Sequence, residues 1–205
     1  MWRRIALLSL LLTLGTAPPS PLERLLDRMD AARGDVRTLE ADFVQRNRVR
    51  LFRQELTLRG RLLYERATPS RLRWEYTAPD PSTVILDGQQ AYLRLPGQAT
   101  QRFDLTQQGT LRAVFDELNL WLGSASLREA EKEYEMSLGG PAVLILRPRP
   151  GTPLAGIFSR VEMRLDPRTL LLSGLLLVES GGDEKEIAFT RIVRNVALPR
   201  EAFRP

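Results

Sequence analysis

The chain has 205 residues, a formal net charge of +5 and a hydrophobic content of 43%, which suit one folded domain rather than a disordered segment. It contains no cysteine and no histidine. Disulfides, Ser-His and Cys-His nucleophile pairs and the usual nitrogen and sulfur metal ligands are therefore excluded. Carboxylate chemistry remains possible, but Asp42, Glu75 and Glu179 alternate with apolar residues, which favours positions facing solvent. We expect a protein that is not an enzyme and has no cofactor and no metal.

Residues 1–17 have the layout of a secretory signal peptide. Arg3 and Arg4 precede an apolar run at 5–14, and small residues follow at 15–17. An uncleaved membrane anchor is the alternative. With no cysteine available for lipidation, we expect an exported protein of the periplasm whose single mature domain spans 18–205.

The first mature segment, 20–34, is predicted to be a helix. Ser20 can cap it, Pro21 suits its first turn, and Glu23 stands at the capping-box position. Gly34 is expected to end it. Its apolar stripe comprises Leu22, Leu25, Leu26 and Met29.

Beyond this helix the hydrophobic period changes to two, which predicts strands. The segment 71–76 is typical: Leu72, Trp74 and Tyr76 share one face, while Arg71 and Arg73 point to the other. Asp87-Gly88 is a turn signal between two strands. The first group of predicted strands lies at 38–45, 55–65, 71–76, 82–96 and 101–105.

The segment 110–123 returns to helical spacing, with Gly123 as its expected end. The segment 126–138 is ambiguous, helix-like at its start and strand-like at its end. The remaining predicted strands lie at 142–148, 158–166, 170–180 and 185–196.

Ten or so strands joined by short turns predict an antiparallel sheet that twist would curl into a barrel or half-barrel. The two helices would cover its open side. The bulky residues on one strand face can be ordinary core or the wall of a cavity. Curled sheets of this size tend to enclose more volume than their own side chains fill, which favours a cavity for an apolar ligand.

Three stretches carry a resemblance to a known family. "LEADFVQ" is similar to an F-x-Q strand, and "GRLLYERATPSRLRWEYTAPDPSTVILDGQQAYLRLP" resembles a G-x-L…RP…F-x-W…P…SDG…L-W-x-Y-x-P block. "DPRTLLLSGLLLVESGGDEKEIAFTRIVRNVALPREAF" resembles C-terminal strands that close on N-x-x-L-P-x-x-x-F. Together they resemble the LolA family of periplasmic carriers of outer-membrane lipoproteins, over nearly the whole mature chain.

The resemblance implies a mainly β fold with α: a curled antiparallel sheet forming an open half-barrel, capped by an N-terminal helix and a mid-chain helical lid. It implies no catalysis and no cofactor. The expected partners are acylated lipoproteins or another lipid, an inner-membrane ABC transporter and an outer-membrane lipoprotein acceptor. No basic stripe indicates nucleic acid, and nothing requires more than a monomer.

The residues expected to line the lipid cavity are apolar or aromatic and lie on predicted strands: Phe43, Leu58, Leu62, Tyr64, Leu72, Trp74, Tyr76, Ile85, Tyr92, Met163, Leu175 and Phe189. The residues expected to form the inner face of the lid are Leu111, Phe115, Leu118 and Trp121.

Two positions depart from the family pattern. Leu72 stands where the family has phenylalanine, and Thr68 stands where it has the arginine that ties the lid closed. Arg66 and Arg71 are nearby, but neither occupies the matching position, so the sequence leaves the latch unassigned. A carrier of another envelope lipid or glycolipid, or a lipid- or lipoprotein-sensing periplasmic module, are the alternatives.

Overall fold

The computed structural model describes residues 18–51, 54–123 and 126–205, except the side chains of Thr110 and Leu111. The predicted signal peptide lies outside these residues. The elements, in chain order, are α1 (Pro21–Gly34), β1 (Thr38–Val49), β2 (Gln54–Glu65), β3 (Arg71–Ala78), β4 (Ser82–Asp87), β5 (Gln90–Arg94), β6 (Gln101–Asp104), η1 (Leu105–Gln107), α2 (Gly109–Leu122), η2 (Leu127–Lys132), β7 (Tyr134–Gly140), β8 (Val143–Pro148), η3 (Pro153–Gly156), β9 (Phe158–Leu165), β10 (Leu172–Glu179) and β11 (Glu184–Arg194).

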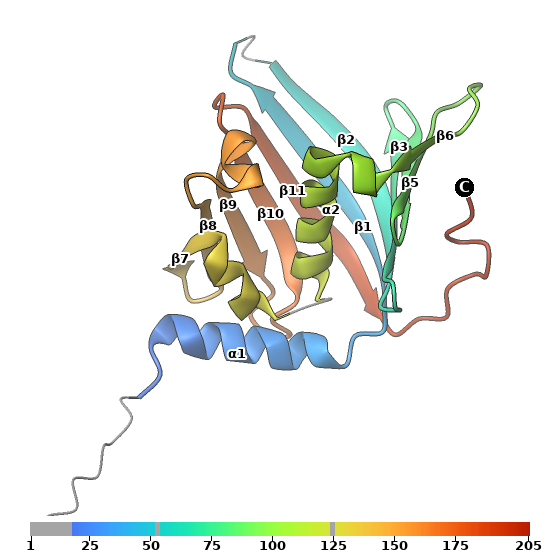
Figure 1. Cartoon of the computed structure of the whole chain (residues 1–205). Helices are drawn as coiled ribbons and strands as arrows, with labels where there is room; N and C mark the ends of the chain where they lie inside the picture. The colour runs from blue at the N-terminus through green and yellow to red at the C-terminus, as the bar shows by residue number, and fades with distance from the viewer. Residues whose placement is uncertain (1–17, 52–53, 124–125) are drawn as a thin grey trace, which may run out of the picture.

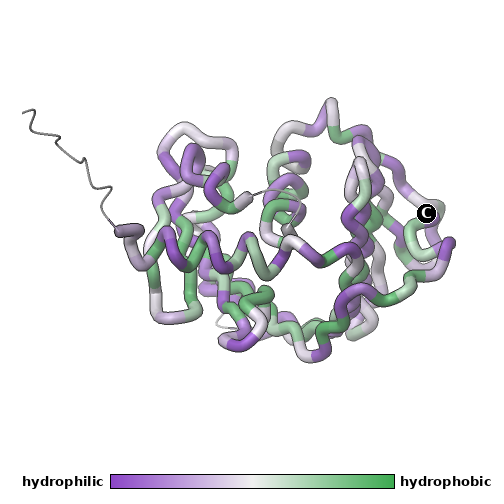
Figure 2. Tube along the Cα trace, turned by 90° about the horizontal axis from the view of Figure 1, so that it is seen from below, coloured by the Kyte–Doolittle hydropathy of each residue, from purple (hydrophilic) through white to green (hydrophobic). Residues whose placement is uncertain are grey.

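Within the described residues, eleven antiparallel strands form one sheet in the order β6-β5-β4-β3-β2-β1-β11-β10-β9-β8-β7. The first and last strands of the chain, β1 and β11, pair at the centre of the sheet. The strands β6 and β7 form its two edges and do not pair with each other. The sheet curves around α2, and α1 crosses one end of it (Figure 1). Seen from that end, the curve is open on one side (Figure 2). The predicted open half-barrel with a helical cover is therefore confirmed.

The helix α1 begins and ends where the sequence predicts. The Ser20 hydroxyl accepts from the Glu23 N–H at 3.1 Å, and the Glu23 carboxylate accepts from the Ser20 N–H at 2.6 Å, which completes the capping box. Leu25, Leu26 and Met29 are buried against the sheet. This buried stripe fixes α1 across the end of the half-barrel.

Alternation along the strands separates an inner from an outer face. In β1, Leu39, Ala41 and Phe43 are buried in the main hydrophobic cluster, and the residues between them are partly exposed. In β3, Leu72 and Trp74 belong to the same cluster, while the Arg71 guanidinium lies 4.9 Å from the centre of the Phe203 ring on the outer face. The predicted two-sided character of 71–76 is thus confirmed.

The ambiguous segment 126–138 contains both kinds of structure: the short helix η2 is followed by the edge strand β7. The helix α2 agrees closely with the prediction. Gly123 caps its C-terminus with a φ of 102° and donates its N–H to Asn119 and Leu120. The left-handed conformation of Gly123 ends α2 at Leu122.

Gly60 lies on β2 where the Phe43 ring packs directly against the backbone, because glycine has no side chain. A Cβ at this position would lie 2.1 Å from the Glu75 carbonyl oxygen and 2.3 Å from the Phe43 ring. Gly60→Ala is expected to lower the free energy of unfolding by about 1–3 kcal/mol, because backbone and ring must both shift. Chemical denaturation measures this loss.

Gly34→Ala is the matched control, since a Cβ there meets nothing within 4 Å. If the two substitutions lower the free energy of unfolding equally, the packing of Phe43 is not the reason that glycine is needed at position 60.

Candidate functional site

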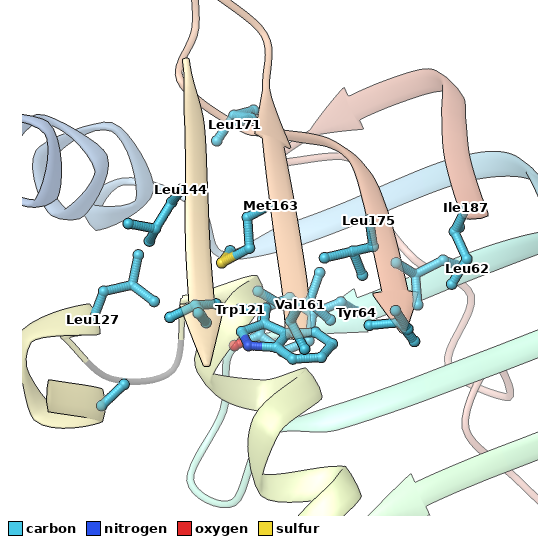
Figure 3. Packing of buried hydrophobic residues seen from close by; sticks show 14 of the residues in the cluster. Leu62, Tyr64, Trp121, Leu127, Leu144, Val161, Met163, Leu171, Leu175 and Ile187 are labelled. Atoms are coloured by element: carbon cyan, nitrogen blue, oxygen red, sulfur yellow. The ribbon is translucent and has the colours of Figure 1, made fainter. Parts of the chain in front are cut away.

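The helix α2 covers the inner face of the sheet with its apolar side. Phe115 and Trp121 are buried and Leu118 is partly buried, all within the main cluster. The Trp121 ring lies among residues of the sheet, near Val161 and Tyr64 (Figure 3). Leu111 lies on α2, but its side chain is outside the described part of the structure. Three of the four predicted lid residues are therefore placed on the inner side of α2.

Most of the predicted lining residues gather on this inner face. An aromatic group stands at its centre, in which the Phe43 ring lies 4.6 Å from Trp74, 5.5 Å from Tyr76 and 6.5 Å from Phe189, between ring centres. The others in the same cluster are Leu62, Tyr64, Leu72, Met163 and Leu175. Their contact with a lipid stays a prediction.

Two predicted lining residues lie elsewhere. Ile85 pairs in register with Arg73, and Tyr92 pairs with Ile85, so both face away from Trp74. Their cluster is a separate one on the outer face, under the C-terminal tail (Figure 1). Their assignment to the inner wall is wrong, because a continuous apolar run in β4 hides which of its two faces is inward. The second cluster contains Leu63, Ile85, Ala202 and Phe203, with Tyr92 and Leu198 against it.

Leu58 lies on β2 two residues before Gly60, on the inward-facing alternation, and is half-buried outside the main cluster. Gln45 takes the corresponding inner position on β1 and is only 4% exposed. It accepts from the Tyr76 hydroxyl at 3.0 Å and donates to Asn47 at 2.7 Å. A polar chain thus borders the aromatic group on the inner face.

The space left beneath α2 is very small. A cleft lined by Leu39, Leu62, Leu122 and Phe189, among other apolar residues, has a volume of about 10 Å³, whereas a single water needs roughly 10–15 Å³. The side chains of α2 occupy the interior that the curled sheet encloses. This cleft, as the described residues line it, has no room for an acyl chain.

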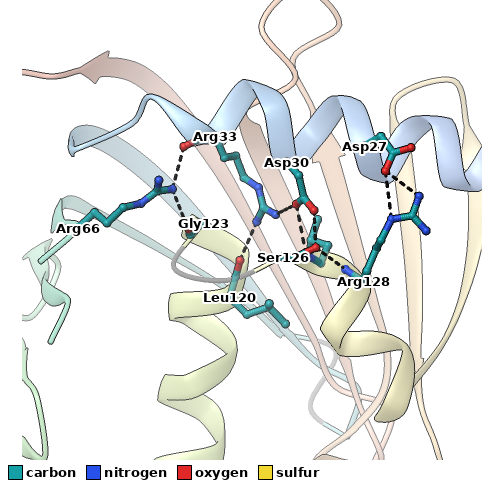
Figure 4. A network of polar contacts seen from close by, with 9 residues as sticks. Asp27, Asp30, Arg33, Arg66, Leu120, Gly123, Ser126 and Arg128 are labelled. Carbon is teal, nitrogen blue, oxygen red and sulfur yellow. Dashed lines mark hydrogen bonds and ion pairs between the residues drawn. The ribbon is translucent and has the colours of Figure 1, made fainter. Parts of the chain in front are cut away.

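Arg66 joins the C-terminal ends of α1 and α2. It follows β2 directly, and its backbone N–H donates to the Arg37 carbonyl at 2.7 Å. Its guanidinium donates to the carbonyl oxygens of Gly34 at 2.9 Å and Arg33 at 2.8 Å, and also to that of Gly123 (Figure 4). Helix C-termini carry unpaired carbonyls and a partial negative charge, which a cation stabilises. The Arg66 guanidinium thus links the C-terminal ends of the two helices, in a region where the sequence left no latch assigned.

Arg33 forms a second link between the helices. Its guanidinium donates to the Leu120 carbonyl at 2.7 Å and is paired with Asp30 (Figure 4). Burial lowers the pKa of Arg33. Although burial opposes it, hydrogen bonds from Ser126 and Arg33 hold the pKa of Asp30 below its ordinary value. These links could not be found from spacing, because the carbonyls they bind are distant in sequence.

Sequence reasoning also missed Glu117, a carboxylate on α2 that is only 7% exposed. Burial raises its pKa from 4.5 to about 7, a rise that the nearby Tyr134 hydroxyl opposes and the charges of Glu133 and Asp116 increase. The Tyr134 hydroxyl and the Trp121 indole N–H lie beside its carboxylate and act on it as hydrogen-bond donors. Its helical spacing to Trp121 was the available signal, because i and i+4 share a helix face.

Within the described ranges, no three carboxylates lie close enough together to hold a metal ion. Among the helices that the structure describes, none is long and apolar enough to cross a membrane. A curled sheet that closes an apolar interior with a latched helix defines a class of proteins that bind apolar ligands.

The comparisons with known proteins agree with this class. The model of the outer membrane lipoprotein carrier protein LolA matches residues 34–205, so the chain belongs to the LolA family. A carrier protein of this kind from Dechloromonas aromatica is 29% identical over 83% of this chain and 77% of its own. One from Alkalilimnicola ehrlichii is 30% identical over 71% of this chain and 65% of its own.

Solved structures share the fold at low identity. An uncharacterized conserved protein from Thermus thermophilus is 12% identical, with a TM-score of 0.55 over 91% of this chain and 94% of that one. A chain in the MucA/MucB complex of Pseudomonas aeruginosa is 15% identical, with a TM-score of 0.51 over 89% of this chain and 60% of that one. At such identities these likenesses show the fold alone.

Proposed function

We propose that this protein is a periplasmic carrier that shields the acyl chains of outer-membrane lipoproteins and moves them from the inner to the outer membrane. The observation that supports this most is an apolar inner face closed by a helix whose attachment includes arginine-to-carbonyl hydrogen bonds. A helix held by such directional hydrogen bonds can move away from the sheet as a rigid body and later form the same hydrogen bonds again.

The chemistry of the inner face suits an acyl chain. Each buried CH₂ group contributes about 0.8 kcal/mol, so exposing one long chain to water costs roughly 10 kcal/mol. A carrier must offset that cost without binding so tightly that release fails. An apolar wall whose own lid competes for the same surface meets both needs, because closing of α2 displaces the cargo.

Delivery requires partners on both sides of the periplasm. The family membership supports receipt from an inner-membrane ABC transporter and transfer to an outer-membrane acceptor. In this proposal residues 1–17 direct export and are removed, and the remaining single domain acts as a monomer.

Arg66 bears on the alternative cargo. Because threonine replaces the family's arginine at position 68, the chain could carry another envelope lipid. Arg66 makes three carbonyl contacts from a position two residues earlier. In this proposal Arg66 takes the part of the missing arginine and latches the lid, which favours lipoprotein acyl chains over another lipid or glycolipid and over a sensing module.

Native mass spectrometry of the protein recovered from its own cell envelope tests the proposal. Bound acylated lipoprotein is expected for the unchanged chain, and Trp121→Ala is expected to reduce its occupancy several-fold because the lid loses the large apolar side chain that would cover the cargo. A free lipid as the cargo would support the alternative carrier, and an empty protein would contradict both.

Phe203→Ala is the matched control, because it removes a buried aromatic side chain from the outer cluster and leaves the inner face intact. Both substitutions should lower the free energy of unfolding by about 3–5 kcal/mol. Only Trp121→Ala should also empty the site; equal loss of cargo in both variants would refute the role of α2 as a lid.

A further inference from the structure

The hairpin formed by β1 and β2 presents apolar side chains to solvent. Leu51 is 82% exposed at the tip of this hairpin, and Leu56 is 49% exposed on β2. The hairpin lies at the end of the sheet opposite α1 and reaches beyond the neighbouring turn between β10 and β11 (Figure 1). In the described part of the chain, the large apolar side chains that are exposed are Leu51, Leu56, Leu138 and Val193. Two of these four therefore belong to one projecting hairpin.

The same hairpin is strongly basic. Residues 46–59 contain five arginines and one carboxylate, that of Glu55. The Glu55 carboxylate lies 3.1 Å from the Arg48 guanidinium. Two carboxylates of β11 also pair with Arg48, Glu184 at 3.4 Å and Glu186 at 3.6 Å. Because these three carboxylates converge on one guanidinium, they leave the positive charge nearer the tip uncompensated.

Arg50 carries that uncompensated charge. Its backbone N–H donates to the Asp183 carboxylate at 3.0 Å, which fixes the chain just before the tip. Among the described residues, none forms an ion pair with its guanidinium. Arg50 lines a cleft of about 510 Å³ between the hairpin and the turn that contains Gly182. Glu55 and Glu184 line this cleft too, but both are paired with Arg48. The cleft thus has room for an anionic group beside a free guanidinium.

An apolar path on β2 leads from the tip toward the aromatic group of the inner face. Leu56, Leu58 and Gly60 alternate along β2, and Gly60 lies opposite Phe43 of that group. Leu56 and Leu58 are outside the main cluster beneath α2, and both are partly or largely exposed. The inner face therefore continues, without a cover from that cluster, toward the end of the sheet where Leu51 and Arg50 lie.

We propose that the tip of the β1–β2 hairpin is a contact site for the surface of a bilayer that contains anionic phospholipids. The Arg50 guanidinium matches the phosphate of a headgroup, to which it can donate two hydrogen bonds. Leu51 leaves water when it enters the boundary between headgroups and acyl chains. An apolar protein surface would cover Leu51 but would leave the charge of Arg50 without an anion, so a bilayer fits better.

The contact goes beyond the carrier function, since it requires no cargo. One leucine and a few arginines give weak and reversible binding, as single anchoring elements do. In a carrier, this contact would bring the uncovered end of the inner face to the membrane surface. Cargo binding and membrane contact are therefore separate properties that can be measured separately.

A fluorophore at position 51 provides the test. The sequence contains no cysteine, so Leu51→Cys gives a single attachment site for the environment-sensitive fluorophore NBD in protein produced from the full sequence. The probe is a vesicle of phosphatidylcholine with about 30% phosphatidylglycerol. The NBD emission is expected to move to shorter wavelength and to rise about twofold, saturably with lipid, because the fluorophore leaves water. High salt should reverse the change.

Val193→Cys is the matched control for the label. Val193 is exposed, pairs with Glu40 near the start of β1, and so lies at the opposite end of the sheet from Leu51. The labelled variant carries the same N-terminal residues, so any membrane binding by residues 1–17 is common to both proteins. NBD at position 193 should not respond to the vesicles.

Arg50→Gln, made in the chain labelled at position 51, should raise the lipid concentration for a half-maximal response about fivefold. Arg194→Gln removes the same charge from an exposed position at the opposite end of the sheet and should leave the response unchanged. The proposal is overturned if the label at position 51 fails to respond, if it responds equally to phosphatidylcholine alone, if position 193 responds as strongly, or if Arg50→Gln has no effect. None of these results bears on the lipoprotein cargo, which mass spectrometry detects independently.

Discussion

Replacing Arg66 with methionine is expected to release α2 from α1 and to speed amide hydrogen exchange throughout α2. The substitution removes three hydrogen bonds from one guanidinium to the carbonyls of Arg33, Gly34 and Gly123. Their loss should destabilise the closed arrangement by about 2–4 kcal/mol, because three carbonyls at those helix ends lose a charged hydrogen-bond donor. Exchange in α1, which is held by its buried stripe, should change less.

The same substitution should change lipid handling. A fluorescent fatty-acyl probe is expected to enter the unlatched protein faster, since opening of α2 no longer breaks those contacts. Arg66→Lys should show most of the increase in hydrogen exchange and probe entry seen in Arg66→Met. A single ammonium group lacks the planar set of donors with which the guanidinium reaches three carbonyls.

Arg61→Met is the matched control. Arg61 also lies on the β2 side of the molecule, but its guanidinium pairs with Glu40 on the outer face. Unchanged exchange in α2 of Arg66→Met, or an equal change in Arg61→Met, would show that Arg66 does not latch the lid.

Glu117 should make the folded protein less stable as the pH rises through neutrality. Its pKa is raised from 4.5 to about 7 by burial, so the folded state binds the proton more tightly than the unfolded state. This contribution to stability is fully present below pH 4.5 and is lost as the pH rises through 7. It amounts to about 3 kcal/mol between these limits.

Glu117→Gln should abolish this pH dependence and raise the free energy of unfolding at pH 8 by up to about 3 kcal/mol, since the amide stays neutral. Denaturant unfolding at several pH values between 5 and 8.5 measures the difference. The control is Glu135→Gln, because Glu135 is exposed. A parallel pH dependence in Glu117→Gln and the unchanged chain would mean that another group titrates in this range.

Much of the fold could be predicted because it depends on local pattern. The capping box at Ser20 and Glu23, the alternation in 71–76 and the glycine that ends α2 each act over a few residues, and the structure confirms all three. The same local rules explain the error at Ile85 and Tyr92. An apolar run with no polar alternation does not show which of its two faces points inward. In β4 the inward face is set by the register of pairing with β3.

The amino-acid sequence by itself determined the class of this protein: a curled antiparallel sheet with two helices, the LolA resemblance, and an apolar inner face. The sheet and the helices follow from periodicity and capping residues, which are properties of short segments, and the LolA resemblance follows from the motifs of three stretches of the chain. Only the tertiary structure decided that α2 fills the interior, that Arg66 bridges the two helices, and that Glu117 is buried beside Tyr134. Each of these depends on atoms far apart in the sequence, and their energies arise only when folding brings a charge to a carbonyl or removes a carboxylate from water.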